Sequence, residues 1–344
     1  LQSQDSMLRS LLQAAVQRFF DSNVAQEVSV KAVMSFSYAL TTWQCLTPQV
    51  LERMEGILVA AAARMEDDSI SDALPTAFKA AASEPCILGQ ARDLGLVALW
   101  KPPNWTVSLP DEDELENVQQ GSNDQDTGRP LPLWVKEHLG RSYQVCRDPS
   151  HQYGLLHRLD RNTSGAVLCA TSYKGLYLSK LQFATRQVVK IYWALCHGHM
   201  VLGPTMLEAP LCGSRQADGS FRTSVESHGR TARTEILQVL HLLGPCHEPV
   251  SLVEVKLHTG RQHQIRAHFS FVGHPLVGDT TYGGHEVSWC PRSFLHSAKL
   301  SLTVGQAFEV TCPLPEDLYD ALLLMEPVSQ EHRGALEKMR AEFR

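Results

Sequence analysis

One carboxylate flanked by cationic side chains is the strongest chemical signal in the sequence. Residues 157–165 read HRLDRNTSG, which places Asp160 between Arg158 and Arg161. Nearby positive charge favours the ionised form of a carboxyl group, and a nucleophile or a base requires that form. The same run of small polar residues also fits a capped turn whose side chains bond the local backbone. On these residues alone, Asp160 is a candidate for catalysis or for turn formation.

A second polar cluster lies about a hundred residues further along the chain. Residues 257–268 read LHTGRQHQIRAH, and GHPLVGD and YG follow at 273–279 and 282–283. The histidines recur every five residues, a step that rotates about 140° on an ideal helix and leaves no shared face for a metal. Arg261 and Arg266 suit phosphate, carboxylate or base edges, although one of them could instead pair with a structural carboxylate. We therefore predict anion or base contacts here and no metal site.

Both clusters resemble the signature motifs of RluA-type pseudouridine synthases. The first matches HRLDxxTSG at every fixed position, and the second matches TGRxHQIR followed by G-x-P-x-x-GD-x-x-YG. Two long motifs in the family's order are far more specific than either motif alone. Weaker matches are Lys101-Pro102 and the KIYWA segment at 190–194, and the resemblance covers about residues 94–318. Where the family continues Lys-Pro-x-Gly, this chain has Asn104, a residue that tolerates the left-handed backbone of such a turn.

The resemblance implies an α+β pseudouridine synthase fold, in which a mixed, mainly antiparallel sheet with flanking helices surrounds a central cleft. It also implies that uracil is detached from C1′ of its ribose, rotated and rejoined through carbon 5, without a metal, redox or nucleotide cofactor. Asp160 matches the essential carboxylate, which acts either as a nucleophile on C1′ or as a base on the sugar. Tyr192 matches the tyrosine that stacks on the base and could help to remove the proton from carbon 5. Arg266 matches the arginine that pairs with the aspartate and keeps it ionised.

The substrate implied by the resemblance is a uridine in structured RNA, with ribosomal or transfer RNA as the expected class. A uridine within a stem must leave the stack before chemistry, and we place Arg158 in the gap that it leaves. Further residues expected to bind the substrate are His157, Arg261, Gln264, Lys101 and Lys190.

Three other classes of protein fit the motifs less well. A catalytically inactive RNA-binding relative would keep the basic cleft but should lack the aspartate, and Asp160 is present. A glycoside hydrolase needs two carboxylates about 5–10 Å apart, whereas the motifs supply one. A serine hydrolase needs a Gly-x-Ser-x-Gly turn, which the sequence lacks.

Charge is distributed unevenly along the 344 residues. The net charge is −6, but residues 151–300 hold 15 Lys and Arg against nine Asp and Glu, and 13 of the 15 histidines. RNA binding requires a local basic surface rather than a positive total, so this block fits a polyanionic partner. Chance clustering on a solvated face is the alternative.

Cysteine usage and hydropathy indicate the compartment only broadly. The nine scattered cysteines form no Cys-x-x-Cys pair, which indicates a reducing compartment without a disulfide framework or a zinc site. No apolar run approaches the roughly 18 residues that a membrane-spanning helix needs. We therefore expect an intracellular monomer without a membrane or metal partner, in the cytoplasm or in an organelle such as a mitochondrion or plastid.

The first 85 or so residues, which the resemblance does not cover, are predicted to be helical. Apolar residues recur at helical spacing within 7–20 and 28–43, and a third helix starts at Thr47-Pro48, with the hydroxyl as its cap. This segment vaguely resembles the helical repeats of organellar RNA-binding proteins. Residues 1–100 hold seven basic and 11 acidic residues, however, and this charge favours a structural or protein-contact module packed on the catalytic body.

The pattern after residue 94 predicts the sheet and the domain limits. Short runs rich in valine and leucine predict strands at 94–100, 166–170, 188–195, 234–240 and 250–257. Helices are predicted at 133–139 and from the cap Ser172 to about residue 186. The expected organisation is a helical accessory segment at 1–88, a catalytic domain at 89–325 with an acidic flexible insert at about 106–130, and a C-terminal helix or tail at 326–344.

Overall fold

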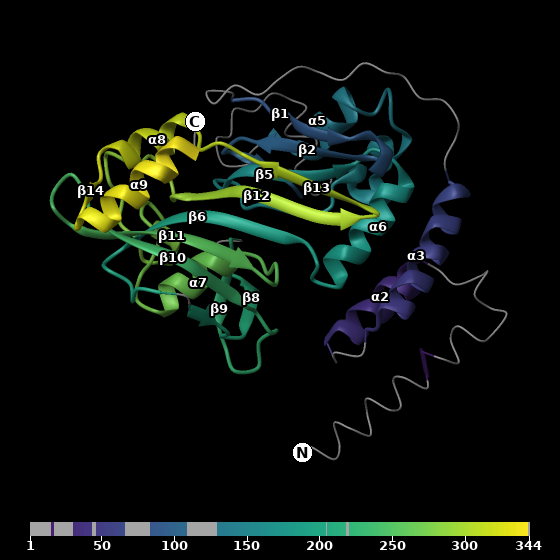
Figure 1. Ribbon diagram of the computed structural model, residues 1–344, viewed down its shortest axis with the longest axis horizontal. Coiled ribbons are helices and arrows are strands. Elements are labelled where there is room, and N and C mark those ends of the chain that lie inside the picture. The colour runs from purple at the N-terminus through teal and green to yellow at the C-terminus, as the bar shows by residue number, and fades with distance from the viewer. Residues whose placement is uncertain are drawn as a thin grey trace, which may run out of the picture.

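A mixed β-sheet forms the centre of the molecule (Figure 1). The computed structural model describes residues 15–16, 30–42, 46–65, 83–108, 129–203, 205–217 and 220–342. Within these ranges ten strands join in one sheet, in the order β1-β2-β5-β12-β6-β11-β10-β14, with β13 beside β12 and β7 beside β10. These strands are β1 (Cys86–Ala91), β2 (Leu96–Lys101), β5 (Ser164–Ala170), β6 (Val189–His197), β7 (Thr205–Leu207), β10 (Thr234–Leu243), β11 (Pro249–Leu257), β12 (Leu295–Val304), β13 (Gln306–Thr311) and β14 (Glu326–Pro327).

Helices and two small strand pairs complete the fold. Helix α6 packs against β5 and β12, and α2 and α3 pack in turn on α6 (Figure 1). None of the described helices combines the length and the apolarity needed to cross a membrane. The helices are α2 (Val30–Thr42), α3 (Pro48–Ala63), α5 (Leu131–His138), α6 (Tyr173–Ala184), α7 (Gln264–Phe271), α8 (Glu316–Leu323) and α9 (Gln330–Glu342), with 3-10 turns at Arg92–Leu94, Gln144–Arg147, Pro149–Gly154 and Thr280–Tyr282. The strand pairs are β3 (Trp105–Thr106) with β4 (Arg129–Pro130) and β8 (Leu211–Arg215) with β9 (Phe221–Val225).

The expected α+β class is confirmed by the strand pairing. Among the described residues, every pairing in the large sheet is antiparallel except that of β5 with β12. Both β2 and β5 are buried along their whole length, which explains their continuous apolar sequence. Gly165 allows β5 to approach β12 closely: its φ is +128°, and a Cβ there would clash with the backbone of Ser297.

Two of the three predicted N-terminal helices are confirmed. Helix α3 begins as predicted, because the Thr47 hydroxyl accepts a hydrogen bond from the Val50 amide at 3.3 Å and Pro48 occupies the first turn. Its buried face includes Met54 and Leu58, and α2 corresponds to the helix expected at 28–43. Most of the helix expected at 7–20 lies outside the described residues; the two that are described there, 15 and 16, are helical.

The segments at both predicted limits of the catalytic domain are paired or packed with its sheet. The limit at 88/89 falls inside β1, which pairs with β2 from Cys86 onward. At the other end, β14 pairs with β10, and α9 buries Leu336 and Met339 in a second hydrophobic cluster. The described part of this segment, 326–342, therefore packs on the folded body, because apolar residues of α9 recur at helical spacing and are buried.

The acidic insert is bounded by two strands that hold its ends together. Residues 109–128, most of the segment expected to be flexible, lie outside the described residues. On either side of them, β3 pairs in parallel with β4, so that Trp105 lies opposite Arg129 and Thr106 opposite Pro130. The guanidinium of Arg129 also lies over the Trp105 ring, 5.2 Å from its centroid.

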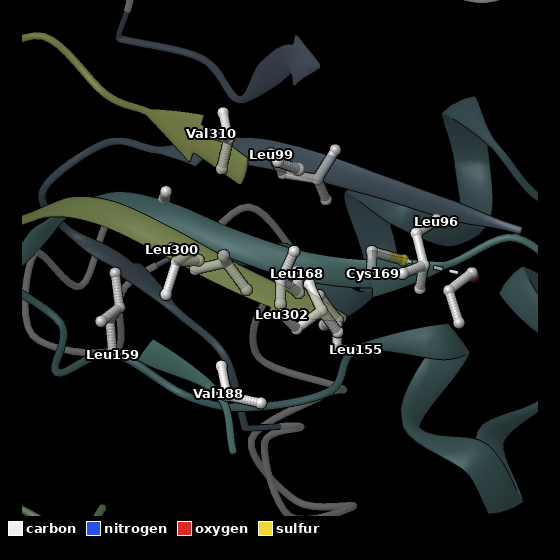
Figure 2. Close-up of a cluster of buried hydrophobic side chains, with 14 of the residues drawn as sticks. Leu96, Leu99, Leu155, Leu159, Leu168, Cys169, Val188, Leu300, Leu302 and Val310 are labelled. Carbon is white, nitrogen blue, oxygen red and sulfur yellow. Dashed lines mark hydrogen bonds between the residues drawn. The ribbon is translucent and has the colours of Figure 1, made fainter. Parts of the chain in front are cut away.

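A large apolar cluster connects the sheet with the turn that carries Asp160. Side chains from β2, β5, β12 and β13 meet in it, and Leu159 belongs to the same cluster (Figure 2). Leu159 is 5% exposed and directly precedes Asp160 in the sequence. Burial of this leucine therefore anchors the turn on its amino-terminal side.

We predict that Leu336→Ala lowers the free energy of unfolding by about 2–4 kcal/mol, because it removes a fully packed side chain and leaves a cavity. Chemical denaturation of the full chain measures this change. The control is Lys338→Ala on the exposed face of the same helix, which should change the stability by less than about 0.5 kcal/mol. Equal stability of the two variants would show that α9 is a detachable tail.

Candidate active site

Two neighbouring cavities meet at Asp160. The first has a volume of about 330 Å³ and the second of about 380 Å³, and Arg158, Asp160 and His263 line both. Among the described residues, the first cavity contains one carboxylate, that of Asp160, and four cationic side chains: Arg158, Arg186, Lys190 and Arg261. A cavity of this size with a few convergent polar groups is typical of a ligand site, and its charge favours an anionic ligand.

Asp160 faces two basic side chains without bonding tightly to either. Its Oδ2 lies 3.7 Å from Nη1 of Arg266, and its Oδ1 lies 3.8 Å from Nε2 of His263. The carboxylate is 16% exposed, so part of it remains accessible from the cavities. The local turn is closed by a hydrogen bond from the Thr163 amide to the Asp160 carbonyl. Asp160 therefore belongs to a turn, as one alternative from the sequence has it, and it also presents its carboxylate to a cavity, which the catalytic alternative requires.

Arg266 is oriented by a different carboxylate, that of Asp279. Its Nε and Nη2 atoms donate to the two oxygens of Asp279 at 2.6 and 2.8 Å, a bidentate arrangement. The guanidinium also lies over the ring of Tyr282, 4.7 Å from its centroid. Burial opposes the charge on Arg266, but the hydrogen-bonded Asp279 carboxylate raises the pKa of this arginine overall. Asp279 thus holds Arg266 so that its remaining nitrogen points toward Asp160.

His263 connects Asp160 with Tyr282 through its two ring nitrogens. Nδ1 lies 2.9 Å from the hydroxyl of Tyr282, which itself accepts a hydrogen bond from the Thr223 amide. If the tyrosine hydroxyl donates to Nδ1, the proton of the neutral ring resides on Nε2, facing Asp160. Burial lowers the pKa of His263, so the ring is neutral near pH 7 and Arg266 is the charged neighbour of Asp160. The φ angle of His263 is +53°, an uncommon conformation for a residue with a side chain.

Tyr192 lies on β6 and lines the same cavity as the Asp160 turn. Its strand neighbours are Ser297 on β12 and Val255 on β11, and the residue is 5% exposed. Tyr192 lines the first cavity together with Asp160. Burial raises the pKa of the Tyr192 hydroxyl above its ordinary value; a hydrogen bond with Ser297 opposes this shift, and the nearby charge of Asp160 adds a smaller increase. The phenol therefore stays protonated at neutral pH.

Three further residues that the sequence assigned to the substrate line the first cavity. Arg158 is exposed, and its side chain forms no hydrogen bond or ion pair within the part of the chain that the structure describes. Lys190 is 9% exposed; burial, and next the charge of Arg261, lower its pKa to about 8. Arg261 donates from Nε to the Thr231 carbonyl at 3.1 Å. These cations are placed to meet a polyanion.

His157 also lines the cavity but is a neutral structural group. Its Nε2 accepts a hydrogen bond from the Leu168 amide at 3.0 Å. Burial, and then the charge of Lys190, lower the pKa of His157 to about 3. The imidazole therefore carries no charge with which to bind a phosphate, and its ring packs near Phe183.

The polar groups of Lys101 and Gln264, two residues expected to bind substrate, are instead hydrogen-bonded within the protein. Lys101 is fully buried, and its Nζ donates to the carbonyl oxygens of Pro102, Trp105 and Arg161 at 2.8–3.0 Å. The amide of Gln264 uses both of its donors and both of its acceptor positions within the protein. It bonds Thr259 Oγ1, the Arg261 amide, the Arg233 carbonyl and Thr234 Oγ1.

A second buried basic residue, Arg292, also donates hydrogen bonds to the turn that carries Asp160. Its Nη1 donates to the Asn162 carbonyl at 2.8 Å, and its Nη2 donates to Ser164 Oγ at 3.0 Å. The same guanidinium is held by two hydrogen bonds to the carboxylate of Asp317. Lys101 and Arg292 together therefore bind consecutive carbonyl groups of the turn, those of residues 161 and 162.

The histidines of the second motif do not form a metal site. Within the described ranges no three His, Cys, Asp or Glu side chains are arranged to hold a metal ion. The motif histidines instead have three separate partners: His258 bonds Glu235, His263 bonds Tyr282, and His268 bonds Thr234.

Comparison with known proteins identifies the family. Residues 96–271 match the sequence profile of the family described as RNA pseudouridylate synthase. The chain belongs to this family. An uncharacterized RNA pseudouridine synthase of Chloroflexus aurantiacus is 37% identical over 209 residues, which amount to 60% of this chain and 64% of that protein. The chain thus spans less than two thirds of the length of this relative.

Two further similar proteins also have names that describe RNA pseudouridine synthases. The tRNA pseudouridine synthase C of Yersinia pestis is 29% identical over 239 residues, 64% of this chain and 83% of that protein. The solved structure of human RNA pseudouridylate synthase domain containing 1 has a TM-score of 0.51 and 25% identity, and it covers 76% of this chain and 98% of that chain. The predicted resemblance to RNA pseudouridine synthases is therefore confirmed.

Three residues of this synthase-family site were present in the motifs but received no role from the sequence. Asp279 follows the glycine of the GD pair, Tyr282 begins the YG pair, and His263 is the first histidine of HQIR. The motif itself could have indicated them. Arg292 lies outside both motifs, and no sequence signal pointed to it.

We predict that Lys101→Met lowers the free energy of unfolding by about 2–4 kcal/mol, because it leaves three buried carbonyl groups without a donor. Turnover should fall as the Asp160 turn relaxes, whereas RNA affinity should stay unchanged. Denaturation, single-turnover kinetics and equilibrium binding measure the three quantities. Lys136→Met, at an exposed position on α5, is the matched control. If the variant had normal stability but bound RNA more weakly, Lys101 would be a substrate-binding residue and not a structural one.

Proposed function

We propose that the protein is an RNA pseudouridine synthase that isomerises chosen uridines in structured RNA through Asp160. The observation that carries this proposal is the accessible Asp160 carboxylate at the junction of two cavities, 3.7 Å from the guanidinium of Arg266. The positive charge of Arg266 favours the carboxylate form that either a nucleophile or a base needs. Membership of the family supports the reaction class.

The proposed roles follow from how each group is held. Asp160 acts on the ribose of the bound uridine, either by attack on C1′ or by removal of a sugar proton. Arg266, fixed by Asp279, keeps the carboxylate ionised without a tight bond that would occupy its oxygens. Tyr192 forms the floor of the cavity and stacks on the uracil. Because its phenol stays protonated, Tyr192 could accept the proton from carbon 5 only after passing its own proton elsewhere.

RNA is the partner that the charge of the cavity supports. Arg158, Lys190 and Arg261 line the cavity and could contact phosphates or base edges, and the exposed Arg158 would fill the gap that a flipped uridine leaves in the stack. We propose ribosomal or transfer RNA as the substrate class; the similarity to a protein named tRNA pseudouridine synthase C supports transfer RNA in particular. An inactive RNA-binding relative is the second possibility, and the presence of Asp160 favours the enzyme.

We predict that Asp160→Asn abolishes pseudouridine formation and leaves RNA affinity within about twofold of wild type, because the amide keeps the shape of the side chain and removes its charge. Release of tritium from RNA labelled at carbon 5 of uridine measures turnover. Asp93→Asn, at an exposed position before β2, is the control and should retain full activity. Substantial turnover by the Asp160 variant would refute the catalytic assignment.

We also predict that RNA affinity falls as the pH rises above about 8, where Lys190 loses its proton. Binding a phosphate favours the ammonium form, so the affinity contributed by Lys190 is present below this pKa and lost above it. The loss should reach about 1.5 kcal/mol, the contribution typical of a hydrogen bond to a charged group. In Lys190→Arg the guanidinium stays charged, and the binding isotherms should not change across this range. Identical pH dependence of the two proteins would exclude Lys190 from phosphate contact.

A further inference from the structure

The N-terminal helices contribute one side chain to the cavity that contains Asp160. Helix α2 packs on α6 through its buried residues Val33, Ser37 and Leu40. Tyr38 is the next residue, about 100° further round the helix from the buried Ser37, and it is 39% exposed. It lines the first cavity together with Asp160, although 122 positions separate the two residues in the sequence. The accessory segment therefore forms part of the site wall.

Tyr38 is held among arginine side chains at this wall. Nη2 of Arg261 donates a hydrogen bond to the Tyr38 hydroxyl at 3.2 Å. This hydrogen bond and the positive charges of Arg261, Arg186 and Arg230 lower the pKa of Tyr38, although partial burial opposes the shift. Arg186 lines the same cavity just after the end of α6, and Arg261 is the motif arginine assigned to the substrate. An exposed aromatic ring is thus surrounded by groups that bind phosphate.

This combination of groups is suited to a nucleotide outside the uridine pocket. Proteins that bind unpaired RNA stack bases on exposed aromatic rings and neutralise the backbone with neighbouring cations. A uridine that enters the cavity to reach Asp160 must leave its stack, which exposes the faces of the adjacent bases. The ring of Tyr38 lies on the wall of this cavity, where such a base would pass.

We propose that Tyr38 stacks on a base adjacent to the target uridine, so that the N-terminal helices complete the RNA-binding surface of the catalytic domain. This inference rests on the proposed function, because it assumes an RNA substrate. The net negative charge of the first hundred residues does not contradict it, since the phosphate contacts come from Arg186, Arg230 and Arg261 of the catalytic domain and α2 supplies the ring. The simpler alternative is that Tyr38 only orients Arg261 through its hydroxyl.

Two substitutions at Tyr38 separate stacking from hydrogen bonding. Tyr38→Phe keeps the ring and removes the hydroxyl, whereas Tyr38→Ala removes both. Ser35→Ala, at an exposed position one turn earlier on α2 that does not line the cavity, is the matched control. The probe is a pool of unmodified tRNA transcripts with tritium at carbon 5 of uridine. Affinity is measured separately by equilibrium binding, and thermal unfolding checks that each variant is folded.

The expected result is a loss of affinity in one variant alone. Tyr38→Ala should bind the RNA about tenfold or more weakly and raise KM to the same extent, with kcat nearly unchanged, because stacking on one base is lost. Tyr38→Phe and Ser35→Ala should stay within about twofold of wild type. In a short RNA with 2-aminopurine beside the uridine, wild type and Tyr38→Phe should quench the fluorescence more than Tyr38→Ala.

The results of these experiments test the role of Tyr38 separately from the proposed function. Absence of tritium release by wild type from this pool would refute transfer RNA as the substrate, while the binding ratios would still test Tyr38 as an RNA contact. Wild-type turnover with equal affinity of Tyr38→Ala and Ser35→Ala would overturn the inference alone. Equal impairment of Tyr38→Phe and Tyr38→Ala would also overturn it, because the hydroxyl bond to Arg261 would then be the contribution of this residue.

Discussion

The position of Asp160 depends on two buried cations that bind the carbonyl oxygens of its turn. Lys101 comes from the end of β2, Arg292 precedes β12, and they bond the carbonyls of Arg161 and Asn162. These two carbonyl groups lie in the turn before β5 and have no partner strand. Without a hydrogen-bond donor, burying each of them would cost about 1–3 kcal/mol. The two strands that flank β5, namely β2 and β12, are thus both linked to this turn through Lys101 and Arg292. On its other side, the turn is fixed by the buried Leu159 (Figure 2).

The distribution of hydrogen bonds between two carboxylates explains why the oxygens of Asp160 remain accessible, as its proposed role requires. Asp279 takes the bidentate bond of Arg266 and is almost completely buried, whereas Asp160 lies 3.7 Å from the same guanidinium. A carboxylate held at bidentate distance would have its oxygens occupied and would be a weaker nucleophile or base. Because Arg266 makes its bidentate bond to Asp279, its charge still stabilises the ionised Asp160 carboxylate, while the oxygens of Asp160 stay accessible.

The sequence predicted the fold better than it predicted individual roles. The five strands predicted from apolar runs correspond to β2, β5, β6, β10 and β11. Strand β12 was not predicted, because its pattern is interrupted by His296, Ser297 and Lys299; the first two are buried and hydrogen-bonded, which a hydropathy pattern cannot indicate. The same limit applies to Lys101, which was expected to bind the substrate: the sequence does not show that its ammonium group is buried and bonded to three carbonyl groups. Tyr38 had no local signal, since its position at the cavity follows from tertiary packing alone.

The central place of β12 has a consequence for the order in which the protein can fold. This strand lies between β5 and β6 in the sheet, yet about a hundred residues separate it from β6 in the chain. During synthesis, β5 and β6 therefore emerge long before the strand that joins them, and their inner edges stay open in the meantime. Tyr192 and the Asp160 turn are on these two strands or next to them, so they are brought together only when β12 inserts. Nascent chains that stop short of residue 295 would present basic and apolar surface without an assembled site, which makes them natural clients for chaperones.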